Sequence, residues 1–194
     1  AAPGAAVVNA YGPTEATVTL MDHWWTEADG TRSWRGDVVP IGTTYGSASV
    51  LVVDDALREV APGAEGELVI GGPQVTGGYV GDPERTAASF VRVPGRQGIH
   101  YRTGDLVVRP LRDGDPVEFL GRVDFQIKIS GHRVELGEIE AAIRAVTGSE
   151  DVVVLGWPRE LTVAHGLVAF VGGSGVDGKE ALAALRERLP HYMV

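Results

Sequence analysis

The residues best placed to do chemistry lie near the start of the chain, in residues 9–15 with the sequence NAYGPTE. A short apolar run before them predicts a buried strand that ends in a turn at Gly12 and Pro13. Within five residues the turn presents an aromatic ring (Tyr11), a hydroxyl (Thr14) and a carboxylate (Glu15). Such a group can stack a base, contact a phosphate and hold Mg²⁺. The alternative is an ordinary Gly-Pro turn with a capping threonine.

Two later segments carry polar side chains in unusual density. Asp105 ends the sequence YRTGD, which predicts a tight turn, and its carboxylate can accept protons from two ribose hydroxyls or simply form the turn. Residues 121–135, GRVDFQIKISGHRVE, predict a charged strand-loop-strand segment. It contains Lys128, one of two lysines in the chain, for which a solvated strand position is the plain interpretation.

Composition excludes several classes of protein. The 194 residues carry a net charge of −9, which disfavours nucleic acid or an anionic membrane as the main partner. The absence of cysteine excludes disulfides, thiolate metal sites and cysteine nucleophiles, and fits a reducing cytoplasm. No apolar run approaches the ~18 residues of a membrane span. The first residues lack a signal peptide and predict a cut inside a longer polypeptide.

Other motifs are incomplete. The five histidines show no metal-ligand spacing, and neither a Gly-x-Ser-x-Gly elbow nor an HExxH pair occurs. Residues 173–180 almost match a phosphate-binding loop. Glu180 stands where that loop needs Ser or Thr for Mg²⁺, so we predict a surface turn there, with Asp177 as the helix N-cap.

Hydrophobic patterning divides the elements into two groups. Apolar runs predict strands, and helical spacing of apolar residues after Glu135 and from Asp177 to Arg188 predicts two amphipathic helices. A short helix is expected after Asp82, as N-cap, and Pro83. The first 120 residues are therefore rich in strands and loops, and the last 70 form a small α+β unit. The expected strands are residues 6–9, 50–53, 67–70, 117–120, 125–129, 152–155 and 167–171, with edge strands around a turn at Asp29-Gly30.

Five segments taken in order resemble the adenylate-forming superfamily: NAYGPTE, GELVIGGPQVTGGYVGDPERTAASF, YRTGDL, GRVDFQIKISGHRVELGEIE and LPHYM. They look most like the amino-acid-activating adenylation domain of a nonribosomal peptide synthetase, and the chain resembles only the C-terminal portion of that domain. The resemblance implies an α/β (α+β) fold. Residues 1–123 would be the β-rich end of the large subdomain. Residues 124–194 would be the small mobile C-terminal subdomain, incomplete at its end.

The resemblance implies a ligase reaction in two steps, with ATP and Mg²⁺ as cofactors. An amino acid carboxylate attacks the α-phosphate, giving an aminoacyl-AMP and pyrophosphate. The thiol of phosphopantetheine on a peptidyl carrier protein then takes the acyl group. Neighbouring synthetase domains and a small MbtH-like helper protein are the further partners it implies, in cytoplasmic secondary metabolism such as antibiotic biosynthesis.

Roles in the first motif follow from the same resemblance. Asn9 would hydrogen-bond the adenine edge and Tyr11 would stack on the base. Gly12 would lie beside the nucleotide. Thr14 would contact the α-phosphate, and Glu15 would be the metal ligand.

Further positions complete the implied nucleotide and substrate sites. Asp105 would bind the ribose hydroxyls, Arg122 would lie near the ribose and phosphate, and Phe119 would flank the nucleotide. Three positions align with the substrate pocket of the family and indicate a small-to-medium, uncharged lining: Ala10, Val18 and Thr19.

The last implied roles belong to the thioester-forming step. Asp124 matches the hinge, Lys128 matches a lysine that enters the site after the hinge rotates, and Gly131 would lie along the pantetheine channel. The family's phosphate loop and most of its substrate pocket would precede Ala1, and an essential lysine would follow Val194, so we expect these residues alone to be inactive.

Two alternatives stay open at this point. One is an acyl-CoA or aryl-acid ligase of the same superfamily. The other is a non-catalytic interaction module that keeps an adenylation-like fold.

Overall fold

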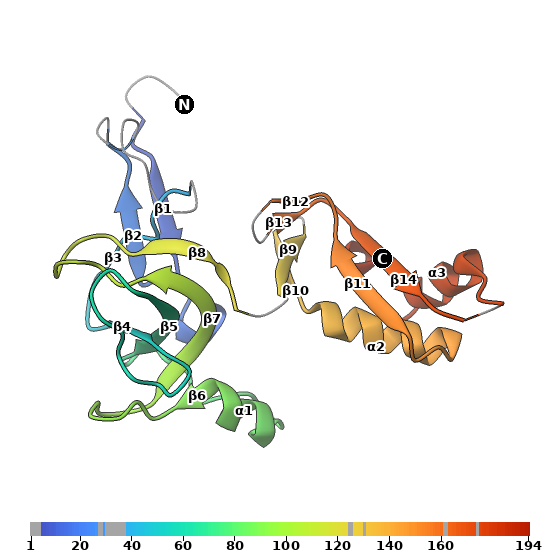
Figure 1. Cartoon of the computed structure of the whole chain (residues 1–194), viewed down its shortest axis with the longest axis horizontal. Helices are drawn as coiled ribbons and strands as arrows, with labels where there is room; N and C mark the ends of the chain where they lie inside the picture. Colours follow the sequence, from blue (N-terminus) through green and yellow to red (C-terminus); the bar gives the residue numbers. More distant parts are fainter. Residues whose placement is uncertain are drawn as a thin grey trace. The chain divides into compact units, whose positions relative to one another are not determined.

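The computed structural model describes most of the chain: residues 5–26, 29, 38–123, 126–129, 131–160, 163–173 and 175–194. The chain divides into two compact units, Ala1–Val123 and Asp124–Val194. Each unit has a hydrophobic core of its own. Figure 1 shows the helices and strands of both units, coloured along the sequence.

The first unit begins with a small antiparallel sheet of β1, β2 and β3. A short 3-10 helix, Thr14–Ala16, follows β1 and leads into the turn before β2. Tyr11 lies opposite Met21 at the end where that turn joins the strands. The bounds are β1 Val8–Tyr11, β2 Met21–Trp24 and β3 Thr43–Thr44.

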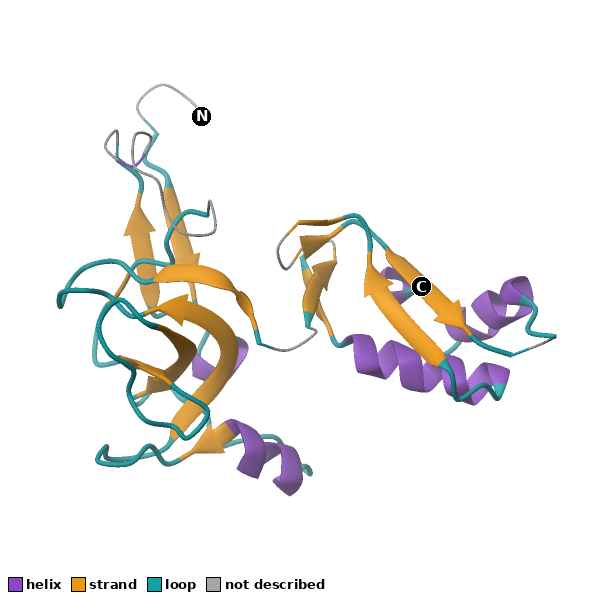
Figure 2. Cartoon of the chain, in the orientation of Figure 1, coloured by secondary structure: helices purple, strands orange, loops and turns teal. Residues whose placement is uncertain are grey.

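A larger antiparallel sheet follows, in the order β4-β5-β7-β6 with β8 also paired to β7. Strand β7 is nine residues long and pairs with β5 along one edge. Strands β6 and β8 both pair with the other edge of β7. Strand β6 pairs with His100 and Tyr101, and β8 pairs with residues 105–108. Figure 2 shows α1 leading into this sheet. The bounds are β4 Ser49–Val53, β5 Glu65–Gly71, α1 Pro83–Ser89, β6 Phe90–Val91, β7 His100–Val108 and β8 Glu118–Arg122.

The core of the first unit joins the two sheets. Leu68, Ile70 and Val107 from the larger sheet are fully buried. They cluster with Met21 of β2 and with Leu20, which directly precedes that strand. Tyr11 and Phe119 pack against this cluster while remaining partly exposed. The apolar core therefore brings the end of β1 next to β7 and β8.

The second unit packs two helices against short strands. Helix α2 packs against β11 and α3 packs against α2. Side chains of β11 alternate between buried and exposed, so one face of its two-stranded sheet with β14 belongs to the core. The bounds are β9 Ile127–Ile129, β10 His132–Val134, α2 Leu136–Thr147, β11 Val152–Gly156, β12 Arg159–Glu160, β13 Val163–Ala164, β14 Leu167–Val171, α3 Gly178–Arg186 and a 3-10 turn His191–Met193.

Helix signals in the sequence are confirmed. Helical spacing predicts four positions on the apolar face of α2: Leu136, Ile139 and Ile143 are buried, and Val146 is half-buried. The carboxylates of Asp82 and Asp177 accept backbone N–H groups at the first turns of α1 and α3. The mixed, sheet-rich α+β class is also as predicted.

Two predictions are wrong. The strand before Gly12 is not buried, because Val7 and Val8 are 49% and 40% exposed. Residues 101–105 do not form a tight turn, because they lie inside the long strand β7. Gly30 of the predicted Asp29-Gly30 turn and part of the segment around it fall outside the described residues, as do Asp124 and Phe125. Within the part of the chain that the structure describes, no helix is long and apolar enough to cross a membrane.

Candidate functional site

A carboxylate joins three strands at the centre of the first unit. The Tyr11 hydroxyl, at the end of β1, donates a hydrogen bond to Oδ2 of Asp105 on β7. Arg122, at the end of β8, donates from Nη1 to Oδ1 of the same carboxylate at 2.6 Å. Tyr11 and Asp105 come from separate motifs 94 positions apart, and they are in direct contact. The guanidinium of Arg122, also predicted for this site, lies beside them.

A β-bulge in β7 positions Asp105. Pairing between β5 and β7 shifts register after Glu67, and Gly104 has a positive φ of 72°. The Gly104 N–H donates to Oε1 of Glu67 at 3.0 Å, and the Asp105 N–H donates to the Thr103 hydroxyl at 3.0 Å. Thr103 donates in turn to the carbonyl of Leu68 at 2.7 Å. The Thr-Gly-Asp sequence thus has the conformational preferences of a turn but uses them within a strand.

Electrostatics keep the Tyr11 hydroxyl protonated. Burial raises the pKa of Tyr11 well above 10.0, and the negative charge of Asp105 raises it further. At neutral pH the phenol is therefore a hydrogen-bond donor to the carboxylate, and the charge of Asp105 is balanced by Arg122.

Glu15 lies in the short helix after β1 and is 9% exposed. Its Oε1 accepts a hydrogen bond of 2.7 Å from the Tyr79 hydroxyl, and its backbone carbonyl accepts one of 2.8 Å from the N–H of Thr76. Thr14, one residue earlier, is exposed. A carboxylate held by a neutral donor is suited to a hard cation such as Mg²⁺, which takes few protein carboxylates together with phosphate oxygens.

The turn after Glu15 contains strained backbone. Thr17 and Val18 have φ values of 64° and 70°, in the left-handed region that β-branched residues rarely adopt. The turn folds back so closely that a Cβ on Gly12 would lie 2.6 Å from the Val18 carbonyl oxygen. Val18 is 69% exposed, Thr19 is half-buried and Ala10 is exposed.

Two predicted nucleotide contacts have other partners in this structure. The side-chain amide of Asn9 donates to the carbonyls of Pro40 at 2.8 Å and Val39 at 3.3 Å. Phe119 is half-buried against the core and lies across from Val107 in the β7–β8 pairing. In this structure Asn9 therefore binds the backbone of residues 39–40, and Phe119 packs against the core of the first unit.

Two predicted residues belong to the second unit. Lys128 is exposed on β9, between Arg133 of β10 and Val163 of β13. Gly131 has a φ of 83°, and no atom lies within 4 Å of the position a Cβ would take, so the space beside it is open. Asp124, the predicted hinge, lies outside the described residues.

Comparisons with known proteins agree on one family. Residues 1–80 match the family model described as AMP-binding enzyme. All of the chain matches a linear gramicidin synthase polypeptide of Brevibacillus parabrevis at 44% identity over 200 residues, and 98% of it matches enterobactin synthase component F of Escherichia coli at 39% identity over 202 residues. It matches the crystal structure of the Vibrio cholerae adenylation domain AlmE, in complex with glycyl-adenosine-5'-phosphate, with a TM-score of 0.82 and 34% identity over 97% of this chain.

The chain belongs to the AMP-binding enzyme family. It also matches PA1221, described as a nonribosomal peptide synthetase protein containing adenylation and PCP domains, with a TM-score of 0.77 and 33% identity. This AMP-binding chain spans 4% of the gramicidin synthase polypeptide, 15% of the enterobactin synthase component and 35% of the AlmE chain.

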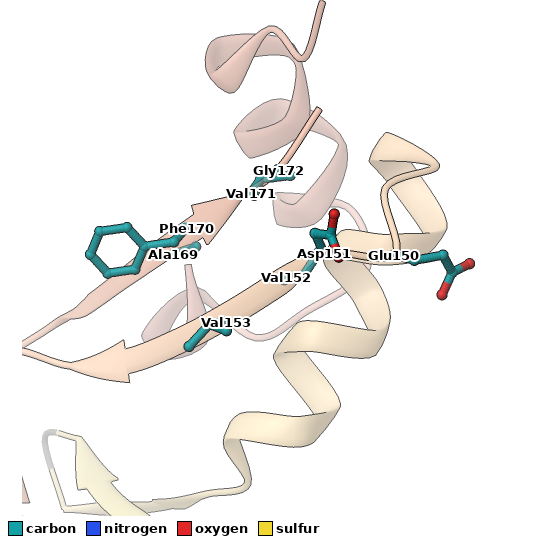
Figure 3. Close-up of a pocket in the computed structure, with 8 residues that line it drawn as sticks. All are labelled: Glu150, Asp151, Val152, Val153, Ala169, Phe170, Val171 and Gly172. Atoms are coloured by element: carbon teal, nitrogen blue, oxygen red, sulfur yellow. The ribbon is translucent and has the colours of Figure 1, made fainter. Parts of the chain in front are cut away.

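Two hollows lie in the second unit. One is a depression of about 730 Å³ over one end of the β11–β14 sheet, where the ring of Phe170 extends away from the strands (Figure 3). The other, of about 280 Å³, is bordered by His132, whose ring stacks on Tyr192 with the centroids 4.0 Å apart. Across the described residues, no group of three His, Cys, Asp or Glu could hold a metal ion.

Sequence reasoning missed three residues that hold this site of the AMP-binding fold. Glu67 and Thr103 fix the bulge that presents Asp105, and Tyr79 holds Glu15. The glycine in Thr-Gly-Asp was a usable signal for the bulge. Tyr79 carried no signal of its own, because its partner lies 64 positions away.

Proposed function

We propose that this chain is the C-terminal portion of an adenylation domain that activates an amino acid with ATP and passes it to a carrier protein. The observation that carries the proposal is the cluster of Tyr11, Asp105 and Arg122. Relatives named as peptide synthetases, and a neighbour solved with glycyl-adenosine-5'-phosphate, support the same assignment.

The cluster has the chemistry to hold a nucleoside. A carboxylate offers roughly four lone-pair sites, more than the bonds from Tyr11 and Arg122 use, so Asp105 can also accept ribose hydroxyl protons. Arg122 supplies positive charge beside the place where the α-phosphate would lie, and the flat ring of Tyr11 offers a surface for a base. Gly12 and Thr14, which follow in the chain, would approach the phosphates.

In the first step an oxygen of the amino acid carboxylate bonds to the α-phosphorus, and the bond from that phosphorus to pyrophosphate breaks. Both reactants are anionic, so the barrier is largely charge repulsion. Mg²⁺, which Glu15 would hold, supplies charge neutralisation when it is bound. Arg122 contributes a second positive charge, and the exposed Val18 would form part of an uncharged substrate lining, with Ala10 and Thr19.

In the second step the thiol sulfur of phosphopantetheine bonds to the acyl carbon, and the bond from that carbon to the AMP oxygen breaks. AMP leaves and the thiol proton passes to water. We assign this step to residues of the second unit. The cationic Lys128 would balance the leaving phosphate, and the open space beside Gly131 would pass the narrow pantetheine arm. Asp124 would be the hinge between the two units. The absence of cysteine fits a reducing cytoplasm as the setting.

The test is pyrophosphate exchange into ATP by a synthetase that contains this chain, measured across a panel of amino acids. One or a few amino acids should stimulate exchange, and Asp105→Ala should abolish it while the control Asp54→Ala, in an exposed turn, should not. Lys128→Ala should slow thioester formation more than exchange. Absence of exchange with every amino acid would overturn the proposal, and transfer to free coenzyme A in place of a carrier protein would assign the acyl-CoA ligase branch.

A further inference from the structure

Tyr79 makes a contact that the roles assigned so far do not use. It lies between β5 and α1, and its hydroxyl donates to Oε1 of Glu15 at 2.7 Å. The Glu15 side chain is almost buried, so this donor compensates part of the cost of placing a carboxylate there.

The Tyr79 ring is itself fixed by helix α1 and strand β6. Its backbone N–H donates to the hydroxyl of Thr86 at 2.9 Å, and that hydroxyl donates to the carbonyl of Asp82, the N-cap of α1, at 2.7 Å. Phe90 meets the ring edge-on, with centroids 5.5 Å apart. The guanidinium of Arg85 lies 4.6 Å from the ring centroid. The phenol therefore approaches Glu15 from a rigid support.

The segment before Tyr79 is bound to the turn that carries Glu15. The Thr17 hydroxyl donates to the carbonyl of Gln74 at 2.8 Å, and the Thr76 N–H donates to the carbonyl of Glu15 at 2.8 Å. Together with the Tyr79 hydroxyl, these bonds connect the two loops on both sides of the carboxylate. The backbone and the side chain of Glu15 are thus held from the same loop.

The chemistry of the Tyr79 side chain suits this role. Its phenol is a neutral hydroxyl that donates one hydrogen bond to the Glu15 carboxylate. It can orient a carboxylate without neutralising the charge that a cation needs, which a lysine at this position would do.

We propose that Tyr79 is a positioning residue: its hydroxyl holds the Glu15 carboxylate in the orientation that receives the Mg²⁺ of Mg·ATP. The proposal rests on the proposed function, because it takes Glu15 as the metal ligand. Tyr79 itself contacts neither the nucleotide nor the reacting atoms. Its effect should therefore pass entirely through Glu15 and appear only when Mg²⁺ is present.

The experiment measures the dissociation constant of ATP for the full synthetase, with Mg²⁺ and with EDTA. Tyr79→Phe removes the hydroxyl and keeps the ring against Phe90 and Arg85. It should weaken ATP binding about tenfold with Mg²⁺, the loss of one hydrogen bond to a charged group, and leave binding in EDTA unchanged. The matched control is Tyr45→Phe, an exposed tyrosine elsewhere in the same unit, which should change neither constant.

A second variant separates positioning from a purely structural role. In a Glu15→Gln background, Tyr79→Phe should no longer alter the Mg²⁺ dependence of ATP binding. An equal loss with and without Mg²⁺, or a tenfold loss that persists in the Glu15→Gln background, would overturn the positioning role. If the unmodified synthetase binds ATP no better with Mg²⁺ than with EDTA, the metal role of Glu15 fails and the positioning role with it. Normal Mg·ATP binding that is insensitive to Tyr79→Phe refutes the positioning role alone.

Discussion

Replacing Asp105 with asparagine tests whether one carboxylate joins β1, β7 and β8. The substitution keeps the size of the side chain but replaces one acceptor oxygen with an NH₂ group, which can only donate hydrogen bonds. Either Tyr11 or Arg122 must then face another donor, because each now bonds to a different oxygen of Asp105.

The expected cost follows from the burial of the pair. The side chains of Arg122 and Asp105 are 12% and 10% exposed, and the joining distance is 2.6 Å. Removing one partner of a buried ion pair costs about 3–5 kcal/mol, and a hydrogen bond to a charged group contributes about 1.5–3 kcal/mol. Because asparagine keeps one acceptor, we expect Asp105→Asn to lower the free energy of unfolding by about 3 kcal/mol.

Urea unfolding of the 194-residue chain at pH 7 measures this loss. Hydrogen exchange of amides in β5 and β7 reports the first unit separately from the second. The midpoint should fall by about 2 M urea with an unchanged dependence on denaturant, since the same surface is exposed on unfolding.

Asp54→Asn is the matched control. Asp54 pairs with Arg58 at 2.8 Å, but their side chains are 35% and 74% exposed, so solvent screens the pair. Asparagine also keeps an oxygen for the backbone N–H groups that Asp54 accepts in its turn. Equal losses in Asp105→Asn and Asp54→Asn would refute the claim that burial makes the Asp105 pair important.

Two further predictions concern the same unit. Burial, and then the charge of Arg96, lowers the pKa of His100 from its ordinary 6.5, and its Nδ1 finds no hydrogen-bond partner among the described residues. Below pH 6.5 the unfolded chain binds a proton at His100 more readily than the folded chain does, so the free energy of unfolding should fall as the pH drops. In His100→Gln the free energy of unfolding should depend less steeply on pH over this acidic range. A Cβ on Gly12 would meet the Val18 carbonyl oxygen at 2.6 Å, so Gly12→Ala should cost about 1–3 kcal/mol in urea unfolding. Gly77→Ala, whose Cβ would meet nothing within 4 Å, should cost far less; equal losses would contradict the close approach.

Local signals predicted the two helices of the second unit well. The helical spacing of Leu136, Ile139 and Ile143 and the cap at Asp177 are properties of neighbouring residues, and both elements are where the pattern placed them. The apolar face of a helix and the cap of its first turn can be predicted from neighbouring residues alone, without knowing which distant segments pack against the helix.

Strand β7 shows where local reasoning failed. Thr103, Gly104 and Asp105 have turn preferences, and a bulge uses the same preferences inside a strand. The difference is decided by Glu67 and Leu68, which supply the hydrogen-bond partners from another strand. The same limit hid Tyr79, whose importance comes only from its contact with a residue far away in the chain.

The position of Asp105 on β7 has a consequence for altering this protein. Val107, two residues further along, is fully buried, and Asp105 itself faces Arg122 across the strand pair. A substitution of Asp105 would therefore disturb its hydrogen-bonded neighbours Tyr11 and Arg122 and the apolar interior beside them. Val18, which is 69% exposed, can be replaced with less loss of packing, provided that the new residue tolerates the positive φ of that position.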